Sequence, residues 1–480
     1  MDIPSENLGE RIRREALRLG FDRVGIAPVR ESEHAAFYRR WLAAGRHGTM
    51  DYLARPDAVE RRTDPRAAWP ELRSAIVVAM DYHPGDGSPG RGVGREAGGC
   101  VGREPVGPED GGAEAGTGGG RESPGSGRAA SAPRESRPPG VGRAAPVSRE
   151  LRPTDVVAAA PAPAPADPAR AIIARYARGR DYHKVMKKRL LALLRFIEAE
   201  AGRALPAARA YVDTGPVLER ELARRAGLGW FGRNTMLIHP RAGSYFFIGT
   251  LLLELDLEPD PPFEADRCGT CSACIDACPT GALLGRDADG APVIDATRCI
   301  SYLTIEHHGP IPRELRPLIG NRVFGCDICQ EVCPFSRKFS EPTSEPAFAA
   351  RGRGESPFGV EPDPRLSGTS HPGTASPSLV ELMSMDADDW ESFSRGSAVR
   401  RAGRSGFLRN VAVALGNWGS EEAVPVLSDA LSDSDPLVRG HAAWALGEVG
   451  SPAAQSALAA RLEVEVDDWV REEVELALRR

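Results

Sequence analysis

Eight of the nine cysteines lie between residues 268 and 333, and their spacing is the strongest chemical signal in the sequence. A first run has the pattern C-x2-C-x2-C-x3-C-P, and a second run has the pattern C-x2-C-x3-C-P. A single cysteine, Cys299, stands between the two runs. Thiolates are soft ligands that favour zinc and iron–sulfur clusters, so this segment is predicted to bind metal.

The first run has the spacing with which bacterial ferredoxins bind [4Fe–4S] clusters, and its fourth cysteine would ligate a neighbouring cluster. The second run is one thiolate short, and Cys299 can supply it. Zinc sites also use four thiolates, and disulfides are a further alternative. For two clusters, the predicted ligand sets are Cys268, Cys271, Cys274 and Cys333 for one, and Cys278, Cys299, Cys326 and Cys329 for the other.

Length and composition indicate a globular protein of two or three domains. The chain has 480 residues and a formal net charge of −6, which argues against a wholly basic nucleic-acid binder. A cysteine set without the spacing of a disulfide scaffold fits a reducing compartment. We find neither the apolar core of a signal peptide nor the roughly 18 apolar residues of a membrane span. We therefore expect a cytoplasmic protein without membrane contact, and a monomer.

The fold class expected is multidomain. An α/β core, in which helices and strands alternate, is interrupted by a low-complexity tract rich in Gly, Pro, Ser, Ala and Arg. We interpret this tract as a disordered insertion, with a regulatory arm as the alternative. The predicted parts are the core at 1–84 and 170–261, the insertion at 85–169, a ferredoxin-like two-cluster domain at 262–340, a linker at 341–376, and all-α HEAT-like repeats at 377–480.

The C-terminal part repeats an Arg-x3-apolar motif at Arg409 and Arg439, and a third, truncated copy begins at Arg471; these arginines are 30 and then 32 residues apart (409 to 439 to 471). Such a period indicates stacked helical hairpins of HEAT type. Solenoids of this kind usually bind extended partners.

Asp213 is the first candidate for acid–base chemistry, because it follows a predicted strand and precedes Thr-Gly-Pro. A carboxyl group at a strand end, with its pKa raised by a bulky apolar neighbour, would suit proton donation. The alternative is an N-cap for a helix that begins near Pro216. His183 is a second candidate, as ligand or base, or else a satisfied residue of a helix start.

Two basic groups could contact RNA, although either could be an ordinary solvated face. The first group adjoins Tyr176 and Tyr182, which suits nucleic acid. The sequence has no dinucleotide-binding glycine pattern in a βαβ context and no P-loop, so bound NAD is not expected to supply electrons. The first group is Arg175, Arg178, Arg180, Lys184, Lys187, Lys188 and Arg189, and the second is Arg395, Arg400, Arg401, Arg404 and Arg409.

The sequence resembles epoxyqueuosine reductases, the cobalamin-dependent iron–sulfur enzymes that complete queuosine formation in tRNA. The resemblance covers about 1–84 and 170–340, and a HEAT-like tail also occurs in longer members of that family. Two departures are the insertion after Asp81 and Arg233, where the family often has Lys. The motifs that carry the resemblance lie at 47–52, 175–184, 212–220, 226–234, 298–306 and 325–330.

The resemblance implies that an external low-potential donor passes electrons through two clusters to cobalamin held by the core. The substrate would be tRNA carrying epoxyqueuosine, and Asp213 matches the family's proton donor. The positions that match cobalamin-facing residues are, besides Asp213, Arg55, Arg233, Leu237, Ile248, Ser301 and Asp327.

Two alternatives stay open at this point. A cobalamin-dependent reductive dehalogenase shares the two-cluster logic, but that class usually carries a twin-Arg export signal, and no apolar segment follows Arg13 and Arg14 here. A non-catalytic iron–sulfur carrier with a HEAT docking module would not need Asp213.

Overall fold

The computed structural model describes residues 7–83, 167–351 and 376–480. Most of the predicted insertion and most of the predicted linker therefore lie outside the described residues. The first part of that linker, however, packs on the core. Phe348 is 3% exposed and its ring lies 4.9 Å from that of Phe247. The linker predicted from residue 341 thus begins too early, because a buried aromatic side chain holds residues 346–348 in place.

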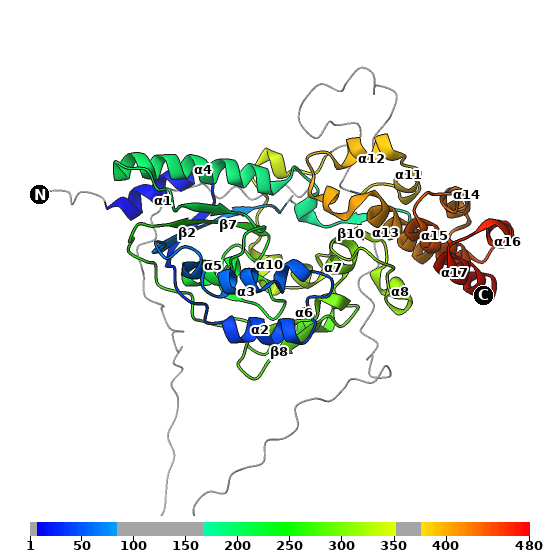
Figure 1. Ribbon diagram of the computed structural model, residues 1–480, viewed down its shortest axis with the longest axis horizontal. Helices are drawn as coiled ribbons and strands as arrows, with labels where there is room; N and C mark the ends of the chain where they lie inside the picture. The colour runs from blue at the N-terminus through cyan, green and yellow to red at the C-terminus, as the bar shows by residue number, and fades with distance from the viewer. Residues whose placement is uncertain (1–6, 84–166, 352–375) are drawn as a thin grey trace, which may run out of the picture. The chain divides into compact units, whose positions relative to one another are not determined.

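A four-stranded sheet forms the centre of the core (Figure 1). Its order is β1 (Arg23–Pro28), β2 (Ser74–Asp81), β7 (Phe246–Leu253) and β4 (Arg209–Tyr211), and every pairing is antiparallel. The predicted alternation of helices and strands is present, and the antiparallel direction of the strands is a feature that the sequence did not predict. Alternation alone does not fix the direction in which each strand enters a sheet.

Helices cover both faces of this sheet. On one face lie α1 (Leu8–Arg18) and α4 (Tyr182–Ala201), and on the other lies α5 (Glu219–Arg225). Along α4, Met186, Leu190, Leu193 and Ile197 are fully buried, at the three- and four-residue spacing of one helix face. With both faces covered, β2 is apolar and buried along nearly its whole length. Two further helices are α2 (Ala35–Ala43) and α3 (Pro56–Thr63).

The cysteine-rich domain consists of short elements joined by loops. Helices α6 and α9, which follow the starts of the two cysteine runs, contact each other, and β10 pairs in parallel with β3 (Ile172–Ile173) of the core. The elements are α6 (Ala273–Asp276), β8 (Leu283–Arg286), β9 (Pro292–Ile294), α7 (Ile300–Ile305), α8 (Arg316–Ile319), β10 (Arg322–Phe324), α9 (Ile328–Glu331) and α10 (Pro334–Phe339).

The C-terminal part is all helical, as predicted, and α13, α15 and α17 pack in sequence. Gly416 makes the first of these contacts possible, because a Cβ there would lie 2.9 Å from Cα of Ala445. No described helix has both the length and the apolar character needed to cross a membrane. The helices are α11 (Leu379–Met383), α12 (Ala387–Ser394), α13 (Gly403–Trp418), α14 (Val424–Ala430), α15 (Pro436–Val449), α16 (Pro452–Val464) and α17 (Asp468–Leu478).

Buried polar contacts join this helical part to the cysteine-rich domain. Arg409 donates to the carbonyl oxygens of Leu303 (2.6 Å) and Gly309 (2.8 Å). A second contact is the two-pronged ion pair between Arg316 and Glu473, with N–O distances of 2.7 and 3.0 Å. Both side chains are at most 2% exposed. The repeats are therefore an integral part of the domain that precedes them.

Replacing Glu473 by Gln should destabilise the protein by about 3–5 kcal/mol, because it leaves the Arg316 guanidinium buried without its counter-charge. Urea unfolding followed by circular dichroism measures this loss. Glu475→Gln on the same helix is the control, since the Glu475 side chain is 44% exposed and its pair with Arg479 spans 3.5 Å. Equal stability of the two variants would contradict a structural role for the buried pair.

Candidate functional site

A cavity of about 720 Å³ lies between the sheet and the cysteine-rich domain. Phe246, Phe247 and Ile248 of β7 give it an apolar wall, and thiols give it another. A cavity of this size with apolar walls and few polar groups has the character of a small-molecule or cofactor site.

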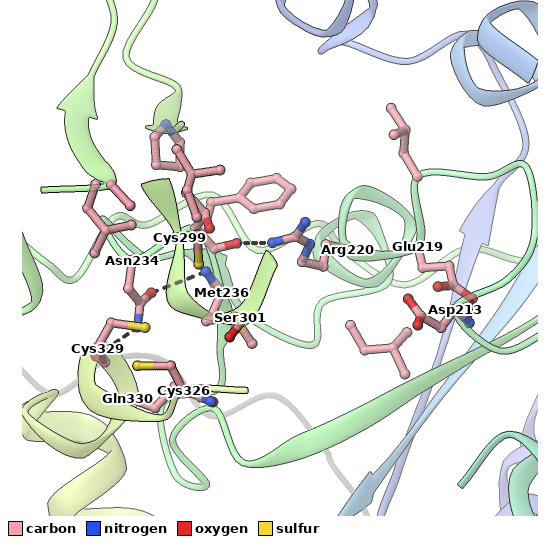
Figure 2. Close-up of a pocket in the computed structure, with 18 of the residues that line it drawn as sticks. Asp213, Glu219, Arg220, Asn234, Met236, Cys299, Ser301, Cys326, Cys329 and Gln330 are labelled. Atoms are coloured by element: carbon pink, nitrogen blue, oxygen red, sulfur yellow. Dashed lines mark hydrogen bonds between the residues drawn. The ribbon is translucent and has the colours of Figure 1, made fainter. Parts of the chain in front are cut away.

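Cysteines of both runs lie close enough to act on one another electrostatically. Burial and then the negative charges of Cys268 and Cys333 raise the pKa of Cys274 to about 11. Burial, followed by the charges of Cys326 and Cys299, raises the pKa of Cys329 well above its ordinary value. Such mutual effects require short distances, and Figure 2 shows the sulfur atoms of Cys299, Cys326 and Cys329 close together. The second predicted set, Cys278, Cys299, Cys326 and Cys329, lines the cavity.

Asp213 lies on the opposite side of the cavity, next to Glu219 (Figure 2). Its backbone is left-handed, with φ of 60°, and its N–H donates to Oε1 of Glu219 at 2.9 Å. The Asp213 side chain is 67% exposed, because it faces the cavity rather than the core. The N-cap alternative is wrong, since α5 begins at Glu219 and its N-cap is Leu218, without a side-chain hydrogen bond.

The predicted rise in the pKa of Asp213 is also wrong. Desolvation does raise it, but hydrogen bonds with His183 and Tyr182, together with nearby positive charge, outweigh desolvation and hold this pKa below its usual range. The Tyr182 hydroxyl donates to Oδ2 of Asp213 at 2.9 Å. Asp213 is therefore ionised at neutral pH and needs a source of protons before it can act as an acid.

Two neighbours of Asp213 hold protons near neutral pH. Desolvation opposes the charge of His183, yet hydrogen bonds with Asp181 and Asp213 raise its pKa to about 9. Burial and then the charge of Asp213 raise the pKa of Glu219 to about 8. His183 Nδ1 lies 2.7 Å from Oδ1 of Asp181, and its Nε2 lies 3.6 Å from Oδ2 of Asp213. Both interpretations of His183 remain: its Nδ1 binds the N-cap residue of α4, as at a helix start, and its Nε2 approaches Asp213.

Three of the residues matched to cobalamin contacts line the cavity, and three do not. Ile248, Ser301 and Asp327 lie in its walls. Burial raises the pKa of Asp327, whose carboxylate accepts the backbone N–H of Arg175 at 2.8 Å.

The three residues outside the cavity lining have other surroundings. The Arg55 side chain is 66% exposed, and Leu237 is buried in the core beneath the sheet. Arg233 donates to the carbonyl oxygen of Gly269 at 2.7 Å. These three residues match cobalamin-facing positions in sequence, but their side chains do not line the cavity.

Sequence reasoning missed a turn that follows the 226–234 motif. Asn234, Thr235 and Met236 line the cavity, and Thr235 has φ of 63°. The Asn234 side chain donates to the carbonyl oxygen of Cys329 at 3.2 Å and accepts the Met236 N–H at 3.2 Å (Figure 2). The turn thus joins the cavity to the second predicted set of cysteines. An Asn after the glycine-rich stretch was the available signal.

Each basic group divides into internal and exposed members. Arg409 is buried, so the prediction that it contacts RNA is wrong, whereas the partly exposed Arg175 and Arg189 pair with Glu331 (2.5 Å) and Glu345. An arginine that finds carboxylate or carbonyl partners within the protein can thus be internal rather than part of an exposed basic face. The members that are classed as exposed are Arg180, Lys184, Lys187, Lys188, Arg395, Arg400 and Arg401.

Family comparisons agree with this architecture. Residues 155–214 match the family model of the epoxyqueuosine reductase QueG, residues 267–336 match the 4Fe-4S double cluster binding domain, and residues 397–479 match HEAT repeats. The chain therefore combines a double-cluster iron–sulfur domain with a helical-repeat domain.

A curated epoxyqueuosine reductase of Pseudomonas aeruginosa is 37% identical over 92% of this chain and 95% of its own length. Two solved structures are 25% identical and cover 98% of both chains. One, with a TM-score of 0.68, is an epoxyqueuosine reductase with an epoxyqueuosine-modified tRNA-Tyr stem loop. The other, with a TM-score of 0.67, is the Bacillus subtilis enzyme with the loop of a catalytic aspartate swung out of the active site. This chain belongs to the epoxyqueuosine reductase family, whose named members are oxidoreductases.

His183 should titrate near pH 9, and Asp213→Asn should lower its pKa, because one of the two carboxylates that favour the charged ring is lost. Because the folded-state pKa exceeds the ordinary 6.5, the associated stabilisation is present below pH 6.5 and is lost as the pH rises through about 9. NMR of ¹⁵N-labelled histidines measures both values. His239, whose pKa burial lowers to about 3, is the internal control and should stay neutral. Titration of His183 near 6.5 in both proteins would contradict this geometry.

Proposed function

We propose that this enzyme reduces epoxyqueuosine to queuosine at the wobble position of tRNA, with electrons that pass through two [4Fe–4S] clusters to cobalamin. The observation that carries the proposal is one cavity with thiols on one wall and an acid–base group on the other. Removal of the epoxide oxygen as water consumes two electrons and two protons. A site for this reaction therefore needs a source of electrons and a source of protons.

The proposed cluster ligands are the two predicted sets of thiols described above. Bound clusters would supply single electrons at low potential, received from an external donor. Cys299 is the N-cap of α7, and the backbone N–H groups of Ser301 and Tyr302 face its sulfur. Hydrogen bonds of this kind stabilise a ligating thiolate, which supports Cys299 as the ligand outside the two runs.

The cavity also has features that suit cobalamin, a flat macrocycle with amide groups at its edge. Phe246, Phe247 and Ile248 offer an apolar surface, while Ser301, Asn234 and Gln330 offer polar groups for amides. Ile248, Ser301 and Asp327 are the matched contacts that we retain in the cavity lining. When bound, cobalamin would supply the two-electron reductant at the substrate carbon.

Asp213 is the proposed proton donor to the departing oxygen. An epoxide oxygen leaves poorly as an alkoxide, so its protonation lowers the barrier. Because Asp213 is ionised in the resting structure, we propose that the protonated His183 passes it a proton, through the 3.6 Å approach of Nε2 to Oδ2, as negative charge develops on the substrate oxygen. Glu219, which accepts the Asp213 N–H, holds the loop in place and can store the second proton.

The exposed lysines of α4 are proposed to hold tRNA. Lys184, Lys187 and Lys188 lie at the three- and four-residue spacing of one helix face, close in sequence to the cavity residue Tyr182. A row of cations suits the phosphate backbone, and the tRNA stem loop bound by a related structure supports such a partner. A tRNA substrate places the proposed activity in the cytoplasm. The relatives favour this function over the dehalogenase-like and electron-carrier alternatives.

Reconstituted protein with cobalamin and a low-potential reductant should convert tRNA carrying epoxyqueuosine to a product with one oxygen fewer, seen by mass spectrometry of the nucleosides. Asp213→Asn should slow this conversion by about 100-fold or more, in the range of a lost general acid. Asn tolerates the left-handed backbone, so cluster and cobalamin spectra should stay unchanged. An active Asp213→Asn enzyme would overturn the assigned role, and an inactive wild type would overturn the function.

Lys184→Gln and Lys188→Gln should each weaken tRNA binding and reduce the slope of log affinity against log salt by about 1, because each removes one phosphate contact. Filter binding between 50 and 200 mM salt, roughly the range over which such contacts are lost, measures the slope. Arg479→Gln is matched in charge and lies at the end of the tail, with a 72% exposed side chain, and should leave the slope unchanged. Identical slopes for all variants would exclude α4 from the RNA surface.

A further inference from the structure

Tyr52 is a motif residue that the proposed chemistry does not use. Its side chain lines the cavity yet is 41% exposed, which is unusual for a large aromatic residue in the described chain. The residue lies in a short 3-10 turn, Asp51–Leu53. The preceding backbone is fixed to the cysteine-rich domain, because the Thr49 N–H donates to the Tyr302 hydroxyl at 2.7 Å. The hydrogen bond between Thr49 and Tyr302 therefore holds the turn that carries Tyr52 at the cavity mouth.

Arg401 reaches the same place from the helical tail. It lies in the 3-10 segment Ala398–Ala402, immediately before α13, and binds Glu306 through Nε and Nη2, the latter at 3.0 Å. The Arg401 side chain is 46% exposed and that of Glu306 is 21% exposed. A two-pronged pair fixes the plane of the guanidinium, so Arg401 presents its remaining N–H donors in one orientation.

Electrostatics place these side chains around one opening. Burial, and then the charges of Glu306 and Asp213, raise the pKa of Tyr52, whereas Arg401 acts in the opposite direction. Arg401 in turn is one of the positive charges that lower the pKa of Asp213. The aromatic ring and the fixed cation therefore lie close to the proposed proton donor while both stay accessible from outside.

We propose that Tyr52 and Arg401 form a nucleotide-binding ledge at the cavity mouth, where Tyr52 stacks on a base that flanks the wobble nucleotide and Arg401 binds the adjoining phosphate. This inference rests on the proposed function and adds a partner surface to it. A nucleotide whose base enters an enclosed cavity leaves the stack of its neighbours. An exposed aromatic ring replaces the lost stacking partner for any base, and an arginine beside it takes the backbone charge.

The ledge gives the helical tail a role beyond stability. Arg401 is joined to α13, whose Arg409 and Asn410 bind the carbonyl groups of α7. The tail therefore holds one cation at a set distance from the cavity, and the 47–52 motif supplies the ring. An RNA loop would be recognised by both parts of the chain at once, whereas an isolated modified nucleoside would not engage them.

The test compares turnover of an epoxyqueuosine-containing anticodon stem loop with that of the free epoxyqueuosine nucleoside. Tyr52→Ala and Arg401→Gln should each lower the ratio of kcat/KM for stem loop over nucleoside by about tenfold, within the range measured for one stacked base. Tyr52→Phe keeps the ring and should retain most of the ratio. Arg479→Gln, equal in charge to Arg401→Gln, should leave the ratio at its wild-type value.

An unchanged ratio in Tyr52→Ala, or equal losses on both substrates, would overturn the ledge. Fluorescence binding of the stem loop separates this result from failure of the proposed function. If wild type binds the stem loop about tenfold tighter than Tyr52→Ala but converts neither substrate, the ledge stands and the function falls. If wild type converts both substrates and the variants bind equally, the function stands and the ledge falls. Cluster absorbance and thermal unfolding check that each variant is folded.

Discussion

The architecture depends on the hydrogen bonds that α13 makes to α7. Arg409 donates to the carbonyl oxygens of Leu303, His307 and Gly309, and Asn410 donates to those of Thr304 and Val323. Buried carbonyl groups without donors are costly, at about 1–3 kcal/mol each. One pair of neighbouring side chains therefore satisfies the end of a short helix that has only six residues of its own.

Helix α7, held in place by these hydrogen bonds, contacts several parts of the site. It begins at the predicted cluster ligand Cys299, places Ser301 in the cavity wall, and fixes the 47–52 motif through Tyr302. Glu306, directly after the helix, holds Arg401. A six-residue helix is marginal alone. Because its contacts come from residues about 100 and about 250 positions away, the proposed electron entry, the cavity and the RNA-facing mouth share one support.

The sequence predicted the parts whose signals are local. Cysteine spacing indicated the two-cluster domain that a family model matches at residues 267–336, and the arginine period located the helical repeats. Features that depend on contacts between residues far apart in the sequence could not be predicted. The ionised state of Asp213 depends on Tyr182 and His183, some 30 residues earlier. Arg409 looked like a surface cation because the carbonyl groups that it binds lie about 100 residues away. The antiparallel sheet likewise depends on how β7 returns beside β2.

The left-handed backbone at Asp213 limits which amino acids fit that position without strain. Asp and Asn enter this region readily because their short side chains bond locally, whereas longer side chains lose about 1–2 kcal/mol there. Glutamate, the other natural carboxylic acid, is thus a poorer substitute than the amide of identical shape. The backbone at this position therefore accepts loss of the carboxylic acid, through Asn, more readily than its exchange for Glu.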